Sequence, residues 1–167
     1  MSDKALALGG MAVAAIAALS LAIALAFQYL GGAVPCELCI TERWAYVATI
    51  VAVGLGVALG RMRLGLVLAA LTLLANVVIS GFHVGVEEGV FALPQSCNAL
   101  GKADTLEALK AQLETAPLPC DQVTVSFLGL SLATWNLILA ILLTIATVVM
   151  LVWPRSAAEQ NGNRRGA

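Results

Sequence analysis

Four long apolar runs, separated by short polar stretches, dominate the pattern of this chain. They cover about residues 5–30, 41–60, 64–82 and 127–153. A helix needs about 20 apolar residues to cross the roughly 30 Å hydrocarbon layer of a bilayer. Because backbone groups in lipid must be hydrogen-bonded within the protein, we expect each run to be an α-helix. The pattern therefore predicts an all-α membrane protein, a bundle of four transmembrane helices.

The composition supports the same class and excludes another. Hydrophobic residues make up 60% of the 167 residues and charged residues only 11%, against about 45–50% and about 25% in ordinary globular domains. A soluble domain of this size cannot bury that much apolar surface. A net charge of -1 and an aromatic content of 5% argue against nucleic-acid binding, which needs a clustered basic face or a stacking platform. We expect a lipid bilayer and no nucleic acid as partner.

The first apolar run also resembles a signal peptide, because Lys4 precedes it. The apolar region of a signal peptide is about 7–15 residues long, whereas this run continues from Ala5 to Leu30. We therefore expect a retained first span.

Basic residues near the span ends predict the orientation. With four spans, both termini and the loop around residues 60–63 lie on one side of the membrane. That side holds six of the nine basic residues, which are Lys4, Arg61, Arg63, Arg155, Arg164 and Arg165. Positively charged loops stay in the cytoplasm, so we place both termini there. The loops of about residues 31–42 and 83–126 then face outward. Residues 1–154 form one membrane domain in this scheme, followed by a disordered tail over 155–167.

The longer outer loop carries the pattern of a short surface helix. Asp104 followed by Glu107 resembles a capping box, which opens a helix. Leu106, Leu109 and Leu113 recur at helical spacing, and such an apolar stripe can lie on the membrane surface. We expect a short helix over these residues.

All four cysteines fall in the two outer loops, as Cys36 and Cys39 in the first and Cys97 and Cys120 in the second. An outward-facing, oxidising compartment is where disulfides persist. One C-x-x-C with two separated single cysteines fits paired zinc knuckles poorly, so we expect no metal. Two interpretations of the four cysteines remain, namely structural disulfides and redox centres.

The first cysteine pair has the surroundings of a reactive thiol. Cys36 and Cys39 directly precede the second span, and the positive end of a helix dipole favours a thiolate. Arg43 lies one turn after Cys39 on the same face, and its guanidinium stays charged. Alternatively, Arg43 anchors the helix by reaching to the lipid headgroups, and Glu42 either pairs near Arg43 or faces water.

Three segments of the chain resemble the bacterial disulfide bond formation protein B (DsbB) family. They are Cys-Glu-Leu-Cys-Ile-Thr-Glu-Arg (36–43), Phe-His-Val-Gly-Val-Glu (82–87) and Phe-Leu-Gly-Leu-Ser-Leu (127–132). The resemblance covers about residues 10–153. It implies a monomer in the bacterial inner membrane with periplasmic redox loops. Such a protein reoxidises a periplasmic DsbA-type thiol oxidase of thioredoxin fold and passes electrons to a membrane quinone, either ubiquinone or menaquinone.

The resemblance also implies residue roles. Cys97 would be attacked by the partner's thiolate, with Cys120 as its disulfide mate. Cys36 would exchange with Cys120, which leaves Cys39 as the thiolate that meets the quinone. Arg43 would sit beside the quinone ring.

A few other residues of the spans draw attention. His83, the single histidine, stands at the outer end of the third span. The resemblance implies that His83 has a role near the quinone headgroup. Without the resemblance, His83 is interpreted as an interface residue bonded to water or to a loop carbonyl. Asn76 and Asn136 are expected to form interhelical hydrogen bonds, and Gly56 with Gly60 to mark close helix packing.

Two other classes of protein remain as alternatives. A vitamin K epoxide reductase-like enzyme also combines a helical bundle, a C-x-x-C and a quinone, but its reactive pair sits late in the bundle. A non-catalytic membrane protein would use its cysteines only to staple the outer loops. That reading gives no reason for Arg43 to follow Cys39 by one turn.

Overall fold

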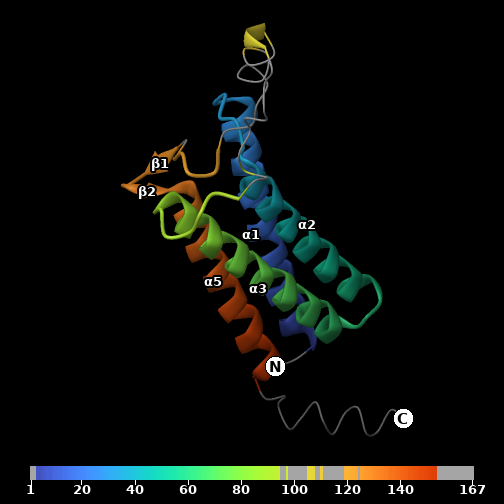
Figure 1. Cartoon of the computed structure of the whole chain (residues 1–167). Coiled ribbons are helices and arrows are strands. Elements are labelled where there is room, and N and C mark those ends of the chain that lie inside the picture. Colours follow the sequence, from blue (N-terminus) through green and yellow to red (C-terminus); the bar gives the residue numbers. More distant parts are fainter. Residues whose placement is uncertain are drawn as a thin grey trace, which may run out of the picture.

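The described part of the chain folds into a bundle of four long helices with a small hairpin at one end (Figure 1). The computed structural model describes residues 3–94, 97, 105–107, 110, 119–123 and 125–153. Its elements are α1 (Asp3–Tyr29), α2 (Glu37–Ala58), α3 (Met62–Glu87), β1 (Ser126–Phe127), β2 (Leu130–Ser131) and α5 (Leu132–Val152). Each of the four helices is long and apolar enough to cross a membrane. The predicted all-α, multi-pass architecture is confirmed.

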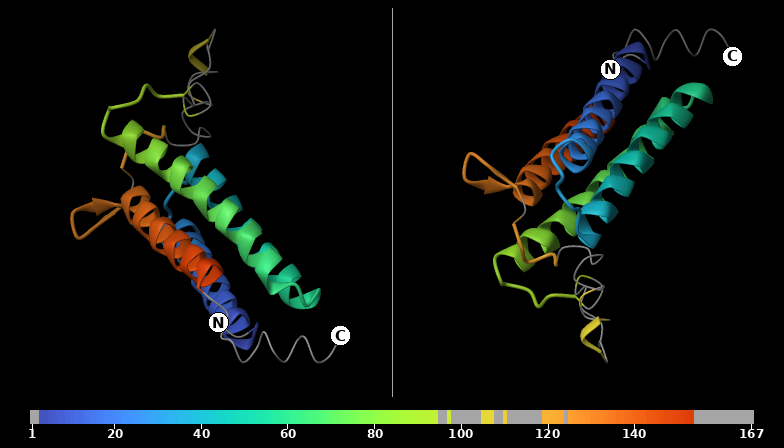
Figure 2. Two further views of the ribbon diagram at one scale, coloured as in Figure 1. Left: turned by 90° about the horizontal axis from the view of Figure 1, so that it is seen from below. Right: turned by 90° about the horizontal axis from the view of Figure 1, so that it is seen from above.

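α1 and α3 each pack against the other three long helices, whereas α2 and α5 each pack mainly against α1 and α3. α2 and α3 form an antiparallel hairpin, α5 lies against α3, and α1 fills the remaining side (Figures 1 and 2). The start of α1, the α2–α3 turn and the end of α5 lie at one end of the bundle (Figure 1). The segments that carry the cysteines therefore lie at the opposite end, as the four-span scheme requires.

The buried side chains form three layers along the bundle axis. Leu6, Ala52 and Leu66 belong to the layer nearest the termini, and Val13, Tyr46, Leu73 and Leu143 to the middle one. The third layer, at the far end, consists of Cys36, Val86, Cys97 and Cys120. Large apolar side chains elsewhere point outward over the whole surface of the bundle, as expected where lipid rather than water surrounds the helices.

Two helices extend further at the cysteine end than the apolar runs predicted. α2 begins at Glu37 rather than at about residue 41, and α3 continues to Glu87 rather than ending at about residue 82. Glu42 and His83 therefore belong to helices and not to the outer loops. A hydropathy pattern ends at the first polar residue, whereas a helix continues when its polar side chains pair with each other inside the bundle.

The predicted start of the fourth span at residue 127 was wrong. Residues 126–131 form a hairpin in which Ser126 pairs with Ser131 and Phe127 with Leu130. Leu128 and Gly129 make the turn with φ of 54° and 80°, the left-handed conformation that two-residue hairpin turns require. Helix α5 begins only after Ser131, whose hydroxyl oxygen accepts a hydrogen bond from the Thr134 amide at 3.1 Å.

Two sequence predictions fall mainly outside the described residues. The short helix over 104–113 is described only at Thr105, Leu106, Glu107 and Lys110, whose side chains are exposed. The tail over 155–167 is not described at all. Both stay predictions.

A glycine contact sets the close approach of α2 and α3. A Cβ on Gly56 would lie 2.9 Å from the Gly65 Cα, and one on Gly65 would lie 2.8 Å from the Ala52 carbonyl oxygen. The predicted packing role of Gly56 is thus confirmed. Gly60 instead lies in the α2–α3 turn with a φ of 62°, so its predicted packing role was wrong. It supplies a conformation that residues with a Cβ adopt only with strain.

We expect Gly56→Leu to destabilise the bundle, because the obstructing atoms belong to a backbone that must shift. Overpacking of this kind costs about 1–3 kcal/mol. The matched control is Gly54→Leu, on the same helix, where an added Cβ meets no atom within 4 Å. Thermal unfolding in detergent should show a lower midpoint for Gly56→Leu alone. Equal midpoints for the two variants would contradict the contact.

Candidate functional site

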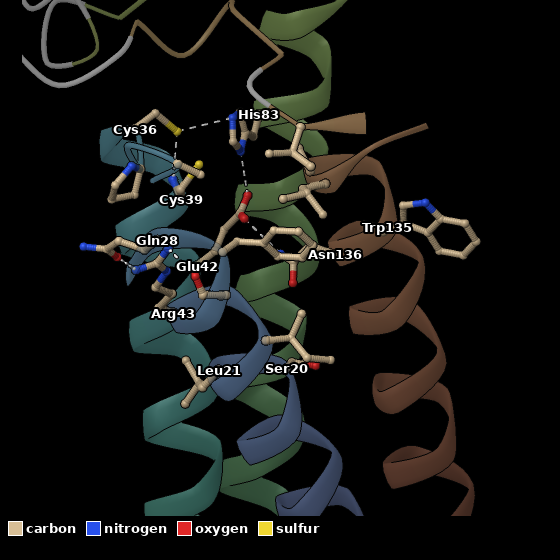
Figure 3. Close-up of a pocket in the computed structure, with 18 of the residues that line it drawn as sticks. Ser20, Leu21, Gln28, Cys36, Cys39, Glu42, Arg43, His83, Trp135 and Asn136 are labelled. Carbon is tan, nitrogen blue, oxygen red and sulfur yellow. Dashed lines mark hydrogen bonds and ion pairs between the residues drawn. The ribbon is translucent and has the colours of Figure 1, made fainter. Parts of the chain in front are cut away.

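A cavity of about 360 Å³ opens between the helices at the cysteine end of the bundle. Its walls are mostly apolar, with Leu21, Ile23 and Phe27 on α1 and Leu132 and Leu139 on α5. Several polar side chains also line the cavity (Figure 3), among them Gln28, Cys36, Cys39, Glu42, Arg43, His83 and Asn136. An apolar cavity with a few convergent polar groups is the usual form of a small-molecule site.

The Cys36–Cys39 pair lies at the start of α2 and borders this cavity. Cys36 is the N-cap of the helix, and its Sγ accepts a hydrogen bond from the Cys39 amide at 3.1 Å. Both cysteines are free, with Cys36 buried and Cys39 half-buried. The pKa of the Cys36 thiol lies below its ordinary value, first because the Cys39 side chain hydrogen-bonds to it and also because the Cys39 amide does, while burial opposes the shift. Such a thiol forms the thiolate more readily than an ordinary cysteine.

The second cysteine pair lies directly beside the first. Cys97 and Cys120 form a disulfide with a Cα–Cα distance of 5.5 Å. Both are buried, and they pack with Cys36 and Val86 in the third core layer, against which Cys39 is also packed. One oxidised pair and one reduced pair therefore share a single buried cluster.

Arg43 connects α2 to α1 at the wall of the cavity. Its Nη1 donates to Gln28 Oε1 at 2.5 Å, and its Nη2 donates to the Ala24 carbonyl oxygen at 3.4 Å. Figure 3 shows the Arg43 and Gln28 side chains meeting below Cys39. Arg43 is half-buried at the cavity wall, and these two bonds to α1 favour a role in the site over the alternative of an anchor that reaches to the headgroups.

His83 links the first cysteine pair to a buried carboxylate. Its Nε2 lies 3.5 Å from Cys36 Sγ, and its Nδ1 lies 2.9 Å from Glu42 Oε1. A second carboxylate, Glu87, has its Oε1 3.9 Å from the same Nε2. His83 and Glu42 are only 3% and 6% exposed, so the readings of His83 as an interface residue and of Glu42 as facing water were wrong.

The contact with Glu42 favours the neutral tautomer of His83 in which Nδ1 carries the proton. An ionised carboxylate can only accept hydrogen bonds, so Nδ1 donates to Glu42. Nε2 is then left as an acceptor that faces the Cys36 sulfur, a tautomer choice of the kind that a neighbouring carboxylate commonly sets. The ring can therefore take up a proton from that thiol.

Asn136 on α5 holds Glu42 from the other side. Its Nδ2 donates to Glu42 Oε2 at 3.0 Å and to Ser80 Oγ at 2.7 Å, while its Oδ1 accepts from the Tyr46 hydroxyl at 2.6 Å. The prediction of an interhelical hydrogen-bonding role for Asn136 is confirmed. Asn76 is fully buried on α3, where its Oδ1 accepts from Ser80 at 3.5 Å. Three helices thus orient one carboxylate.

Sequence reasoning missed Glu42, Gln28 and Glu87 as parts of the site. A signal for Glu42 was present, since an ionisable residue within a membrane helix usually has a specific partner. Assigning residues 31–42 to a loop concealed it. Glu87 could not be assigned, because its contact with Ser131, at 2.5 Å, joins the end of α3 to the start of α5.

Three candidate ligand atoms converge at the top of the cavity. Cys36 Sγ, Cys39 Sγ and a His83 ring nitrogen all lie within 4.8 Å of one another. The cavity itself suits a largely apolar molecule with a few polar atoms, because Arg43 and His83 offer polar groups beside a mostly apolar wall.

Comparison with known proteins gives one family. Residues 7–150 match the family model for disulfide bond formation protein DsbB. The chain is 32% identical over 136 residues to disulfide bond formation protein B of Herminiimonas arsenicoxydans, covering 76% of this chain and 83% of that protein. It is also 26% identical over 147 residues to an uncharacterized protein of Rickettsia prowazekii (strain Madrid E), covering 84% and 85%. No solved structure matches the chain significantly.

Proposed function

Because this chain belongs to the DsbB family, with its role in disulfide bond formation, we propose that it is a quinone-dependent thiol oxidase. It reoxidises a periplasmic DsbA-type protein of thioredoxin fold and passes two electrons to a membrane quinone. The observation that carries the proposal is the shared cluster of Cys36, Cys97 and Cys120 at the edge of an apolar cavity. Thiol–disulfide exchange between the two pairs needs such proximity.

The first exchange takes place at the outer-loop disulfide. A thiolate of the reduced partner attacks Cys97 Sγ, which breaks the Cys97–Cys120 bond and releases the Cys120 thiolate. The partner's second thiolate then attacks the mixed disulfide and releases Cys97. The partner leaves with its own disulfide, and Cys97 and Cys120 are both reduced.

The second exchange returns the electrons to the inner pair. The Cys120 thiolate attacks Cys36 Sγ of an oxidised Cys36–Cys39 pair and releases the Cys39 thiolate. Cys97 then attacks Cys120, restoring the outer disulfide and releasing the Cys36 thiolate. The arrangement in the structure, with Cys97–Cys120 bonded and Cys36 and Cys39 free, corresponds to the end of this sequence.

The residues around the cavity fit a quinone. Leu21, Phe27 and Leu139 line the cavity and would provide apolar contact for a ring and an isoprenoid chain, while Arg43 and His83 would hold the ring beside Cys39. When bound, the quinone supplies the two-electron acceptor that reoxidises the Cys36–Cys39 dithiol. His83 takes up the Cys36 proton at Nε2, and Glu42 stabilises the imidazolium that results.

Two features favour this function over the alternatives. A purely structural role explains the Cys97–Cys120 disulfide. It does not explain why Cys36 and Cys39 are free and lie beside the buried His83 at the edge of a cavity. In a vitamin K epoxide reductase-like arrangement the reactive pair would sit late in the bundle, whereas this C-x-x-C starts α2. The excess of basic residues at the end that holds the termini favours a cytoplasmic position for that end. In the proposed reaction the cysteine end then faces the periplasm, and the protein acts as a monomer.

Steady-state turnover tests the proposal. Purified protein in detergent is mixed with a reduced DsbA-type protein and a soluble ubiquinone or menaquinone analogue, and quinol formation is followed by absorbance. We expect turnover that requires both the partner and the quinone and that disappears in Cys36→Ala. If the folded protein fails to oxidise the partner with either analogue, the proposed function is contradicted.

We expect Arg43→Ala to weaken quinone use more than exchange with the partner. The variant loses a charged donor at the cavity wall, and hydrogen bonds to charged groups contribute about 1.5–3 kcal/mol, which is about 10–100-fold in an equilibrium constant. KM for the quinone should rise in this range, with little change in KM for the partner. Arg61→Ala, in the α2–α3 turn at the other end of the bundle, is the control. An unchanged quinone KM in Arg43→Ala would remove Arg43 from the site.

A further inference from the structure

We propose that the reduced Cys36–Cys39 pair and His83 form a binding site for a thiophilic divalent cation, zinc above all. This is a mononuclear site of two sulfurs and one nitrogen. It differs from the four-cysteine zinc site that the sequence argued against, because Cys97 and Cys120 take no part. Metal binding itself does not depend on the proposed function, but its effect on turnover does.

The distances between the donor atoms suit tetrahedral zinc. Bonds of about 2.3 Å to sulfur and about 2.0–2.1 Å to nitrogen place a tetrahedral sulfur and nitrogen about 3.5 Å apart. Cys36 Sγ and His83 Nε2 are 3.5 Å apart. All three donors lie within 4.8 Å, so rotation of the half-buried Cys39 side chain is the main adjustment needed.

The surroundings of His83 prepare it as a ligand. Glu42 Oε1 accepts from Nδ1 at 2.9 Å, which leaves the lone pair of Nε2 directed toward the sulfurs. Metal-binding histidines almost always donate their second ring nitrogen to a carboxylate or carbonyl group in this way. Asn136 holds the other Glu42 oxygen at 3.0 Å, so the orientation of the imidazole is fixed before a metal arrives.

The site is accessible and its charge is balanced. Cys36, Cys39 and His83 all line the cavity, through which a cation and a water molecule for the fourth position can enter. Two thiolates neutralise the charge of a divalent cation, and their two protons pass to solvent on binding. Oxidation of the pair to a disulfide removes both thiolate ligands, so only the reduced state binds.

This selectivity has a consequence for the proposed reaction. Sulfurs bonded to zinc cannot form the Cys36–Cys39 disulfide, so the cation holds the pair reduced and stops electron transfer out of it. The cation thereby acts as a reversible inhibitor that recognises one redox state of the protein.

The test uses full-length protein without a histidine tag, since His83 is the single histidine of the chain. A Cys97→Ala/Cys120→Ala variant is reduced, freed of reductant without oxygen, and titrated with Co²⁺. We expect the visible bands of tetrahedral, thiolate-bound cobalt at one ion per chain, and their loss on addition of Zn²⁺. Competition with a chromogenic chelator then gives the zinc affinity. Oxidation of the Cys36–Cys39 pair should abolish the bands.

Variants separate this site from adventitious binding. Glu42→Gln should lower the zinc affinity about 10–100-fold, the usual effect of removing a carboxylate behind a ligating histidine, and His83→Ala should lower it further. Gln122→Ala, another residue of the cavity wall, should leave it unchanged. Thermal unfolding shows that each variant is folded. Equal affinity in His83→Ala, or one ion per chain after both Cys36 and Cys39 are replaced, would overturn the proposal.

A second readout works in the wild-type protein. Zn²⁺ should slow alkylation of Cys36 and Cys39 and inhibit quinol formation, and a chelator should reverse both effects. Protection from alkylation together with uninhibited turnover would leave the metal site intact and contradict the proposed electron route. Absence of protection in folded, reduced protein would overturn the metal site.

Discussion

Cys39→Ser is expected to reduce quinol formation to the uncatalysed rate while the outer pair still exchanges with the reduced partner. Serine offers no second sulfur, so the inner pair cannot form a disulfide or deliver two electrons. The Cys97–Cys120 disulfide, which is buried beside Cys36, keeps both of its sulfurs. Quinol absorbance measures the first effect, and trapping of the partner as a mixed disulfide on a gel measures the second.

The control for Cys39→Ser is a change on the same turn of α2. Thr41 is exposed and its hydroxyl donates to the Glu37 carbonyl oxygen at 3.0 Å, so Thr41→Ser alters the helix start without touching the cavity. This variant should turn over like the wild type. Quinol formation at the wild-type rate in Cys39→Ser would mean that electrons leave the protein by another route.

Glu42→Gln is expected to lower kcat about 10–100-fold, which corresponds to losing a hydrogen bond to a charged group of about 1.5–3 kcal/mol. The glutamine keeps the shape of the side chain, but its amide can donate to His83 Nδ1. The ring would then carry its proton on Nε2 and present a donor, rather than an acceptor, to Cys36. Stopped-flow quinol formation is the direct measurement.

The matched control is Glu37→Gln, the same substitution at an exposed position one turn earlier on α2. It should leave kcat unchanged. The thermal unfolding midpoint of Glu42→Gln should fall only modestly, because the Asn136 amide can still donate to the new side-chain oxygen. A wild-type kcat in Glu42→Gln would contradict the assignment of Glu42 as the residue that orients His83.

Much of the architecture could be predicted from the sequence, because hydropathy and helix length are local properties. The four apolar runs predicted four helices. The C-x-x-C motif with Arg43 predicted that a polar, sulfur-containing centre would lie at the start of the second span. The structure places Cys36 at that N-cap and Arg43 one turn beyond Cys39.

The remaining features depend on contacts between helices. Glu42 could not be assigned from the sequence because its role depends on His83 from α3 and Asn136 from α5, which reach it only once the bundle is packed. The hairpin at residues 126–131 was hidden in an apolar run, since Leu128 and Gly129 interrupt the helix by their backbone conformation and not by their polarity. The Gly56–Gly65 contact likewise joins two helices that a one-dimensional pattern treats separately.

The most direct test of the proposed electron route is a single turnover without oxygen. Oxidised protein with bound quinone is mixed with a limiting amount of reduced DsbA-type partner, and quinol and partner disulfide are measured in the same sample. If electrons pass from the partner through both cysteine pairs to the quinone, the two products form in equal amounts, and a transient Cys36–Cys120 disulfide is detectable by mass spectrometry after acid quenching. Partner disulfide formed without an equal amount of quinol would contradict this route.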